Sequence, residues 1–104
     1  MSTVSVYVEV IRGTAKTFTA TFTDLPAPYG TGALIDADSH SISFYDANGL
    51  LQANPTNPTH VSLGTYDYTY TIPATGALGK WRIVWKMTKG GLTSGGDNFF
   101  IVTS

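Results

Sequence analysis

Two segments in the second half of the chain alternate strictly between apolar and polar residues. The apolar positions are Tyr66, Tyr68, Tyr70 and Ile72 in the first segment, and Trp81, Ile83, Trp85 and Met87 in the second. Because side chains on a β-strand alternate between its two faces, each segment presents its largest apolar groups on one face. Residues 73–79 between them contain proline and glycine and predict a turn. We therefore expect an antiparallel hairpin that contributes an aromatic layer to a core.

Shorter stretches elsewhere in the chain show the same period of two. They predict strands at residues 4–10, 17–23, 41–45, 50–52 and 98–102, and a brief edge strand at 33–35. The predicted connections are residues 25–39, 54–59 and 89–97, which are rich in proline, glycine or aspartate. Asn48-Gly49 predicts a tight hairpin turn, because both residues readily adopt positive φ. No segment shows the period of a helix.

About seven short strands separated by turn residues indicate a sandwich or a barrel. We favour an all-β fold, an immunoglobulin-like two-sheet antiparallel β-sandwich that forms one domain over residues 1–104. The Cys…Trp…Cys spacing of antibody domains is absent, since the chain has no cysteine. The prediction therefore concerns the general architecture and excludes an antibody-type domain.

Charge and cysteine content restrict the classes of partner. Charged residues make up 12% of the 104 residues, the formal net charge is −1, and the basic residues are dispersed. No nucleic-acid partner is expected, because such proteins cluster their positive charge. The absence of cysteine excludes disulfides, thiolate chemistry and cysteine-bound zinc. With no leader peptide and no apolar run of about 18 residues, we expect synthesis in a reducing cytoplasm, no membrane association and a complete small gene product.

The candidate chemistry of the chain is sparse. His40 and His60 fall at the edges of predicted strands without a metal-binding spacing, and we interpret them as solvated loop residues. The chain contains no Gly-x-Ser-x-Gly nucleophile motif, so catalysis is not expected. Asp36 and Asp38, with Asp24 and Asp46 nearby, could offer oxygens to calcium. Aspartate in such loops more often binds its own backbone, so we predict no catalytic residue, no metal and no cofactor.

The aromatic residues allow two interpretations. Trp81 and Trp85 could form a sugar-stacking platform, but their face also carries aliphatic residues, which favours burial in a core. Tyr7, Tyr29 and Tyr45 lie off the predicted core faces. We therefore regard these three tyrosines as candidates for an exposed contact surface.

The last predicted strand is apolar on both faces. Phe99, Phe100, Ile101 and Val102 are consecutive, so one alternating pair points into the core and the other points outward. A strand of this kind is either covered by another element or lies in an interface. We select Phe99 and Ile101 as interface residues, and the first strand has a milder version of the pattern through Tyr7. Self-association or docking on a partner through the terminal strands is expected.

Several of these features recur together in a known class of proteins. The segments concerned are Arg12-Gly13, 18–24, 41–46 with Asn48-Gly49, Gly64-Thr65-Tyr66, 78–81 and Phe100-x-Val102. In these segments the chain resembles small immunoglobulin-like accessory proteins of tailed bacteriophages, which are structural proteins of the virion. It is also distantly similar to macroglobulin-like bacterial surface modules. The chain departs from the pattern by a longer loop at residues 26–38.

The resemblance implies a non-enzymatic virion component made in the host cytoplasm. Such a protein would be a capsid decoration, head–tail or tail accessory protein, or a fibre-associated module. Its partners would be capsid or tail proteins and other copies of itself. The alternative is a carbohydrate-binding or adhesion module, with a glycan as the ligand.

Overall fold

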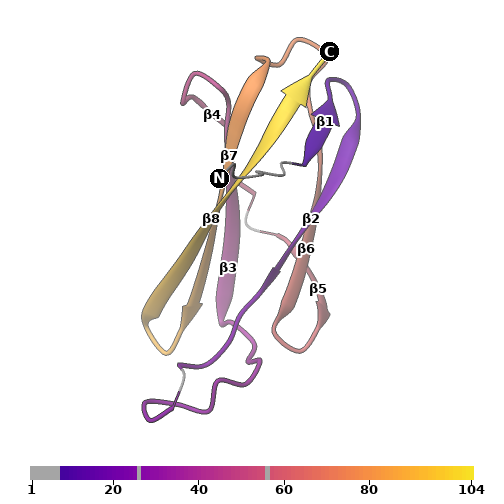
Figure 1. Ribbon diagram of the computed structural model, residues 1–104. Helices are drawn as coiled ribbons and strands as arrows, with labels where there is room; N and C mark the ends of the chain where they lie inside the picture. Colours follow the sequence, from indigo (N-terminus) through magenta and orange to yellow (C-terminus); the bar gives the residue numbers. More distant parts are fainter. Residues whose placement is uncertain (1–7, 26, 56) are drawn as a thin grey trace, which may run out of the picture.

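The computed structural model describes residues 8–25, 27–55 and 57–104. Within these residues the chain forms eight strands and no helix (Figure 1). The strands are β1 (Glu9–Ile11), β2 (Ala15–Thr21), β3 (Ser39–Tyr45), β4 (Leu51–Ala53), β5 (Thr59–Ser62), β6 (Thr65–Thr71), β7 (Gly79–Lys89) and β8 (Leu92–Thr103). The all-β class is as expected, with eight strands in place of about seven. Tyr7 and most of the predicted strand at residues 4–10 lie outside the described residues.

The strands form two sheets that face each other (Figure 1). The larger sheet has the order β1-β8-β7-β3-β4, and the smaller sheet has the order β2-β6-β5. Neighbouring strands are antiparallel except for β1 and β8, which are parallel. The chain passes from one sheet to the other at residues 12–14, where Gly13 has a φ of 80°. The result is a two-layer, sandwich-like arrangement.

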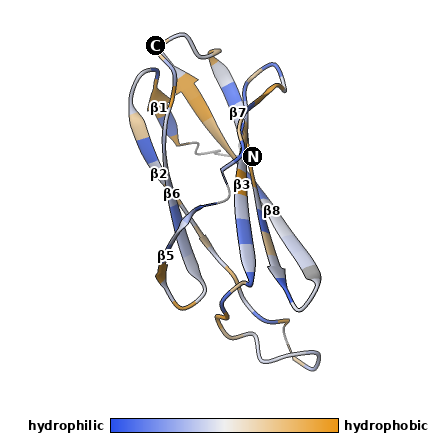
Figure 2. Ribbon diagram, turned by 180° about the vertical axis from the view of Figure 1, so that it is seen from behind, coloured by the Kyte–Doolittle hydropathy of each residue, from blue (hydrophilic) through white to orange (hydrophobic). Residues whose placement is uncertain are grey.

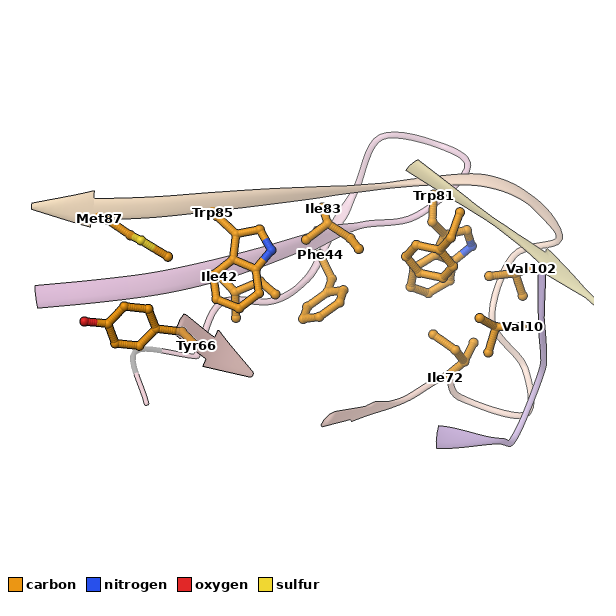
Figure 3. Packing of buried hydrophobic residues seen from close by; sticks show 11 residues of the cluster. Val10, Ile42, Phe44, Tyr66, Ile72, Trp81, Ile83, Trp85, Met87 and Val102 are labelled. Atoms are coloured by element: carbon orange, nitrogen blue, oxygen red, sulfur yellow. The ribbon is translucent and has the colours of Figure 1, made fainter. Parts of the chain in front are cut away.

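The core lies between the sheets and draws side chains from both of them. Its buried members are Val10, Ile42, Phe44, Tyr66, Ile72, Trp81, Ile83, Trp85, Met87, Phe100 and Val102. Figure 3 shows Tyr66 and Met87 at one end of this layer and Val10, Ile72 and Val102 at the other. The Phe18 ring of β2 lies 5.5 Å from that of Phe44 in β3, which links the two layers. Trp81 and Trp85 are therefore buried in the core, as their alternation with polar residues predicts.

The predicted hairpin between residues 66–72 and 81–87 is wrong. The first segment lies in β6 and the second in β7, and these strands belong to different sheets. Residues 73–78 cross from one layer to the other, with a turn in which Gly76 N–H donates to the Pro73 carbonyl at 3.0 Å. Both segments direct their large side chains to the core, and they do so from opposite sides. Alternation specifies the buried face of a strand, and it does not specify the neighbouring strand.

The prediction of a flexible connection at residues 89–97 is also wrong. β7 and β8 form a continuous hairpin of 11 and 12 residues, with Lys89 paired to Leu92. Gly90 and Gly91 make the turn with φ of 58° and 81°. Two consecutive positive φ values are typical of the tight turns that match the twist of a hairpin. The glycine-rich segment thus combines a two-residue turn with extended strand.

Two further differences concern loops. No strand is predicted at β5: Thr59 ends the loop predicted at residues 54–59, and residues 60–62 have no predicted element. β5 is a strand because it pairs with β6, with His60 opposite Tyr66. The expected edge strand at residues 33–35 is reduced to a single bridge between Leu34 and Thr23. A turn at Asn48-Gly49 is confirmed, with Gly49 at a φ of 81°, but Asn48 does not adopt the positive φ expected of it.

Candidate interaction surface

The structure separates the predicted contact residues into groups. Tyr45 is the last residue of β3, and Phe99 and Ile101 lie in β8, so these three belong to the larger sheet. Tyr29 lies in the connection between β2 and β3 and is 82% exposed. Tyr7 is outside the described residues. The larger sheet therefore brings three of the five predicted residues together.

The two faces of β8 follow the predicted alternation near its C-terminal end. Phe100 and Val102 are each 1% exposed and belong to the core. Phe99 and Ile101 consequently point to the outer face, where Phe99 is 46% exposed and Ile101 is half-buried. This end of β8, beside β1, is strongly hydrophobic (Figure 2). An apolar outer surface is thus present at the terminal strand.

Cross-strand register places these residues in a row with others that the sequence did not single out. Leu51 of β4 is opposite Tyr45, Tyr45 is opposite Arg82, and Arg82 is opposite Phe99. In the next row Lys80 is opposite Ile101. Directly opposed residues direct their side chains to the same face. We call this set the outer patch, and it consists of Leu51, Tyr45, Arg82, Phe99, Lys80 and Ile101.

Cations and aromatic rings alternate across the outer patch. The Lys80 Nζ lies 4.2 Å from the centroid of the Phe99 ring, and the Arg82 guanidinium carbon lies 5.6 Å from that of Tyr45. Both distances are within the range of cation–π attraction. Arg82 also donates to an Asp97 carboxylate oxygen from Nε at 3.1 Å and from Nη2 at 2.8 Å. These contacts connect neighbouring side chains of the patch across β3, β7 and β8.

The outer patch combines residue types that are common at protein interfaces. Tyr, Phe and Arg are enriched where proteins bind one another, since each combines a large contact area with a polar or quadrupolar feature. Lys80 and Arg82 are not among the residues selected from the sequence, although their alternation with Trp81 places them on the outer face. The missing information was the register between β3, β7 and β8.

His40 contacts the opposite sheet, and His60 contacts the connection between β2 and β3. In β5, His60 Nε2 is 2.9 Å from an Asp36 carboxylate oxygen, which also accepts the Gly64 N–H at 2.8 Å. The Gly64 N–H, followed by His60, lowers the pKa of Asp36 below its ordinary value. In β3, the His40 ring lies 4.6 Å from the Tyr66 ring. The interpretation of both histidines as loop residues is therefore wrong, although His60 is exposed as expected.

The remaining aspartates of the proposed calcium group lie in separate turns. Asp24 accepts the N–H groups of Thr31 and then Leu25, which lowers its pKa from the ordinary value. Asp46 accepts the N–H groups of the Asn48-Gly49 turn region, and Asp38 accepts that of Gly90. Within residues 8–25, 27–55 and 57–104, no group of three or more His, Cys, Asp or Glu is placed to hold a metal ion. Asp24 and Asp46 therefore bind backbone of their own turns, and Asp38 binds the turn of the β7–β8 hairpin.

Comparison with known proteins does not extend these observations. No model of a known protein family matches the chain, and no curated protein matches it. Within the described part of the chain, no helix is both long enough and apolar enough to span a bilayer.

Proposed function

We propose that this chain is a non-enzymatic structural protein of a phage virion that acts through protein–protein contacts. It would serve as a capsid decoration, head–tail or tail accessory protein, made in the host cytoplasm and located in the virion. The outer patch carries this proposal, because it presents Tyr45, Arg82 and Phe99 in one cross-strand row on an exposed sheet face. Such a row supplies the aromatic and guanidinium anchors that dominate binding energy at protein interfaces.

We propose further that the fold is immunoglobulin-like. The strand order supports this, because a sheet of β1-β8-β7-β3-β4 facing a sheet of β2-β6-β5 has the arrangement A′GFCC′ facing BED. The parallel pairing of β1 with the last strand and the crossings between layers at residues 12–14 and 73–78 are also in keeping with it. The buried tryptophans lie on β7, whereas antibody domains carry theirs on strand C.

Binding to neighbouring virion proteins tests the proposed function. The probes are purified capsid and tail proteins encoded by genes that flank the gene for this chain, with binding measured by calorimetry. We expect at least one of them to bind and Phe99→Ser to weaken that binding by about tenfold or more, as for an anchor residue. Val61→Ser is the matched control, because Val61 is 55% exposed on β5 of the smaller sheet.

Two outcomes would count against the proposal. One is that none of these proteins binds the chain. The other is that Phe99→Ser and Val61→Ser bind as well as the unmodified protein, which would move the contact away from the outer patch.

The exposure of Tyr29 supports glycan binding as a second candidate function. This ring is 82% exposed and available for stacking on a sugar. However, Tyr29 precedes β3 and Tyr45 ends it, so a whole strand separates the two rings, and Trp81 and Trp85 are buried. Binding on a glycan array that is lost in Tyr29→Ala, with folding intact, would favour this candidate over the virion role.

A further inference from the structure

β8 is longer than the strand that covers its outer side. β1 pairs with β8 only from Ile101 to Thr103, and the Val8 carbonyl accepts the Ile101 N–H at 2.8 Å. In Figure 1 the lower half of β8 continues with β7 well beyond β1. Among the described residues, no strand pairs with this side of β8 before Ile101. Within residues 8–25, 27–55 and 57–104, the sheet therefore has an open edge along residues 93–99.

The open edge presents a regular set of backbone groups. Ile101 N–H and the Thr103 carbonyl bond to the β1 side, which shows that odd-numbered residues of β8 direct their groups away from β7. Successive residues of a strand direct these groups to opposite sides. The outward donors and acceptors are therefore those of Thr93, Gly95, Asp97 and Phe99. Unpaired groups of this kind are a template for another strand.

The side chains along this edge are small, polar or absent. Gly96 is opposite the buried Trp85, so a side chain at position 96 would point to the inner face of the sheet. A Cβ atom placed on Gly96 would have no atom of a non-adjacent residue within 4 Å. The inner positions on either side are Ser94 and Asn98, both exposed. Between β2 and this part of β8 lies a groove of about 320 Å³, with Trp85 and Met87 among its lining. Glycine within a strand often marks a place where another backbone approaches closely.

We propose that this edge pairs antiparallel with the same edge of a second copy of the chain, about a two-fold axis at Gly96. Thr93 of one copy then faces Phe99 of the other, and Gly95 faces Asp97, so all outward backbone groups are paired. Two five-stranded sheets join into one continuous sheet. The inference deepens the self-association part of the proposed function, and it does not depend on docking to capsid or tail proteins.

The inner face of the paired edges is self-complementary. Ser94 of each copy lies directly opposite Asn98 of the other, where a hydroxyl and an amide can hydrogen-bond across the strands. At the axis, Gly96 faces Gly96 of the second copy. These opposed positions form a non-hydrogen-bonded pair, in which the backbones approach to a Cα–Cα distance of about 4.5 Å.

The outer face is complementary in charge. Asp97 faces Gly95 of the second copy, and this glycine has no side chain. Lys86 of that copy is the cross-strand neighbour of Gly95 on β7. The flexible lysine can therefore reach across to Asp97, which in its own chain already accepts from Arg82. By the two-fold symmetry the same contact forms twice.

Neighbouring registers are less favourable. A shift in one direction sets Asp97 against Asp97, with like charges directly opposite. A shift in the other direction sets Phe99 against the Gly91 turn and leaves its backbone groups unpaired. The length of the open edge selects the same register, because the hairpin end of one copy reaches Phe99 just before β1 of the other copy begins.

Site-specific crosslinking of the full chain tests the pairing. The chain has no cysteine, so Gly96→Cys introduces a single thiol that meets only its own symmetry mate. The opposed Cα atoms, about 4.5 Å apart, fall within the range of about 4.4–6.8 Å that a disulfide spans. With oxidised glutathione as the oxidant, we expect a covalent dimer on a non-reducing gel. Light scattering of the unmodified chain should give twice its mass of 11.1 kDa.

Ser94→Cys is the matched control, since in this register Ser94 faces Asn98 and not itself. Gly96→Cys should crosslink at least about tenfold faster than Ser94→Cys, because opposed thiols have a high effective concentration. A mixture of Ser94→Cys and Asn98→Cys proteins should crosslink with each other, which provides a second readout if Gly96→Cys folds poorly.

Three outcomes would overturn the proposal. One is a chain that stays monomeric at all concentrations tested. Another is a dimer in which Ser94→Cys crosslinks as fast as Gly96→Cys. The third is a dimer that forms only after residues 1–7 are removed, which would assign the edge to that segment of the same chain. Each result is independent of whether a capsid or tail protein binds the outer patch.

Discussion

At the scale of single residues, the polar groups that enter the space between the sheets mostly have specific partners. The Trp81 indole Nε1–H donates to the Ala77 carbonyl at 2.7 Å, and the Tyr66 hydroxyl accepts the Ala37 N–H at 2.9 Å. The His40 Nδ1 is buried without a hydrogen-bond partner among the described residues. Because an unsatisfied buried polar atom costs free energy, the satisfied groups let large aromatic rings serve as core without that penalty.

The hydrogen bonds of Asp36 with Gly64 and His60 should make the stability of the fold depend on pH in acid. The Gly64 N–H, and then His60, lower the pKa of Asp36 from its ordinary value of 3.8. A carboxyl whose folded pKa is depressed stabilises the fold above its unfolded pKa, and that contribution is lost as the pH falls through the folded pKa. We expect the free energy of unfolding to fall more steeply below about pH 4 in the unmodified protein than in Asp36→Asn. Urea titrations at several pH values measure this, and parallel pH profiles would contradict it.

At the scale of elements, the β7–β8 hairpin determines most of the larger sheet. It forms the two longest strands, and its turn at Gly90-Gly91 needs positive φ at both positions. By contrast, Gly96 has extended backbone and open space around its missing side chain. Glycine therefore has two different roles in this hairpin. At Gly90 and Gly91 it allows the positive φ of the turn, and at Gly96 its missing side chain leaves space for another strand.

Alanine substitutions separate these two roles. Gly90→Ala should lower the free energy of unfolding by about 1–2 kcal/mol, because an L-residue with a left-handed backbone carries that strain. Gly96→Ala should be neutral, or stabilising by up to about 1 kcal/mol through the unfolded chain. Urea denaturation at low protein concentration compares the two. Equal losses of stability would show that the turn does not depend on positive φ at Gly90.

Local patterns in the sequence predicted the elements unevenly. Strands that alternate strongly, such as β2, β3, β6 and β7, were identified. β5 was missed because its residues are all exposed and only its pairing with β6 makes it a strand. The start of β8 was missed because glycine is disfavoured in strands, and here the hairpin partner overrides that preference.

At the scale of the whole molecule, the two sheets share one core and should unfold together. Phe44 lies at the centre of this core, with the Tyr70 ring of the other sheet stacked on it at 4.3 Å. Phe44→Ala should lower the free energy of unfolding by about 3–5 kcal/mol. Tryptophan fluorescence and far-ultraviolet circular dichroism should still report coincident transitions. Separate transitions would mean that the sheets are stabilised independently.

Phe99→Ala is the control for this substitution. Phe99 is 46% exposed on the outer face, where the Lys80 Nζ lies 4.2 Å from the centroid of its ring. The loss should stay below about 1 kcal/mol, the usual size of an exposed cation–π interaction. A loss as large as that of Phe44→Ala would show that Phe99 belongs to the core.

The sequence by itself determined the all-β class, the inward faces of the strongly alternating strands, the burial of Trp81 and Trp85, and the apolar character of both faces at the end of β8. Only the tertiary structure decided which strands are neighbours. It therefore also decided the sheet to which β6 belongs, the row that joins Tyr45 and Arg82 to Phe99, and the open edge of β8. The physical reason is that side-chain alternation is local, whereas strands pair through backbone groups that nearly all residues share. The choice of partner follows from packing the whole chain around one core.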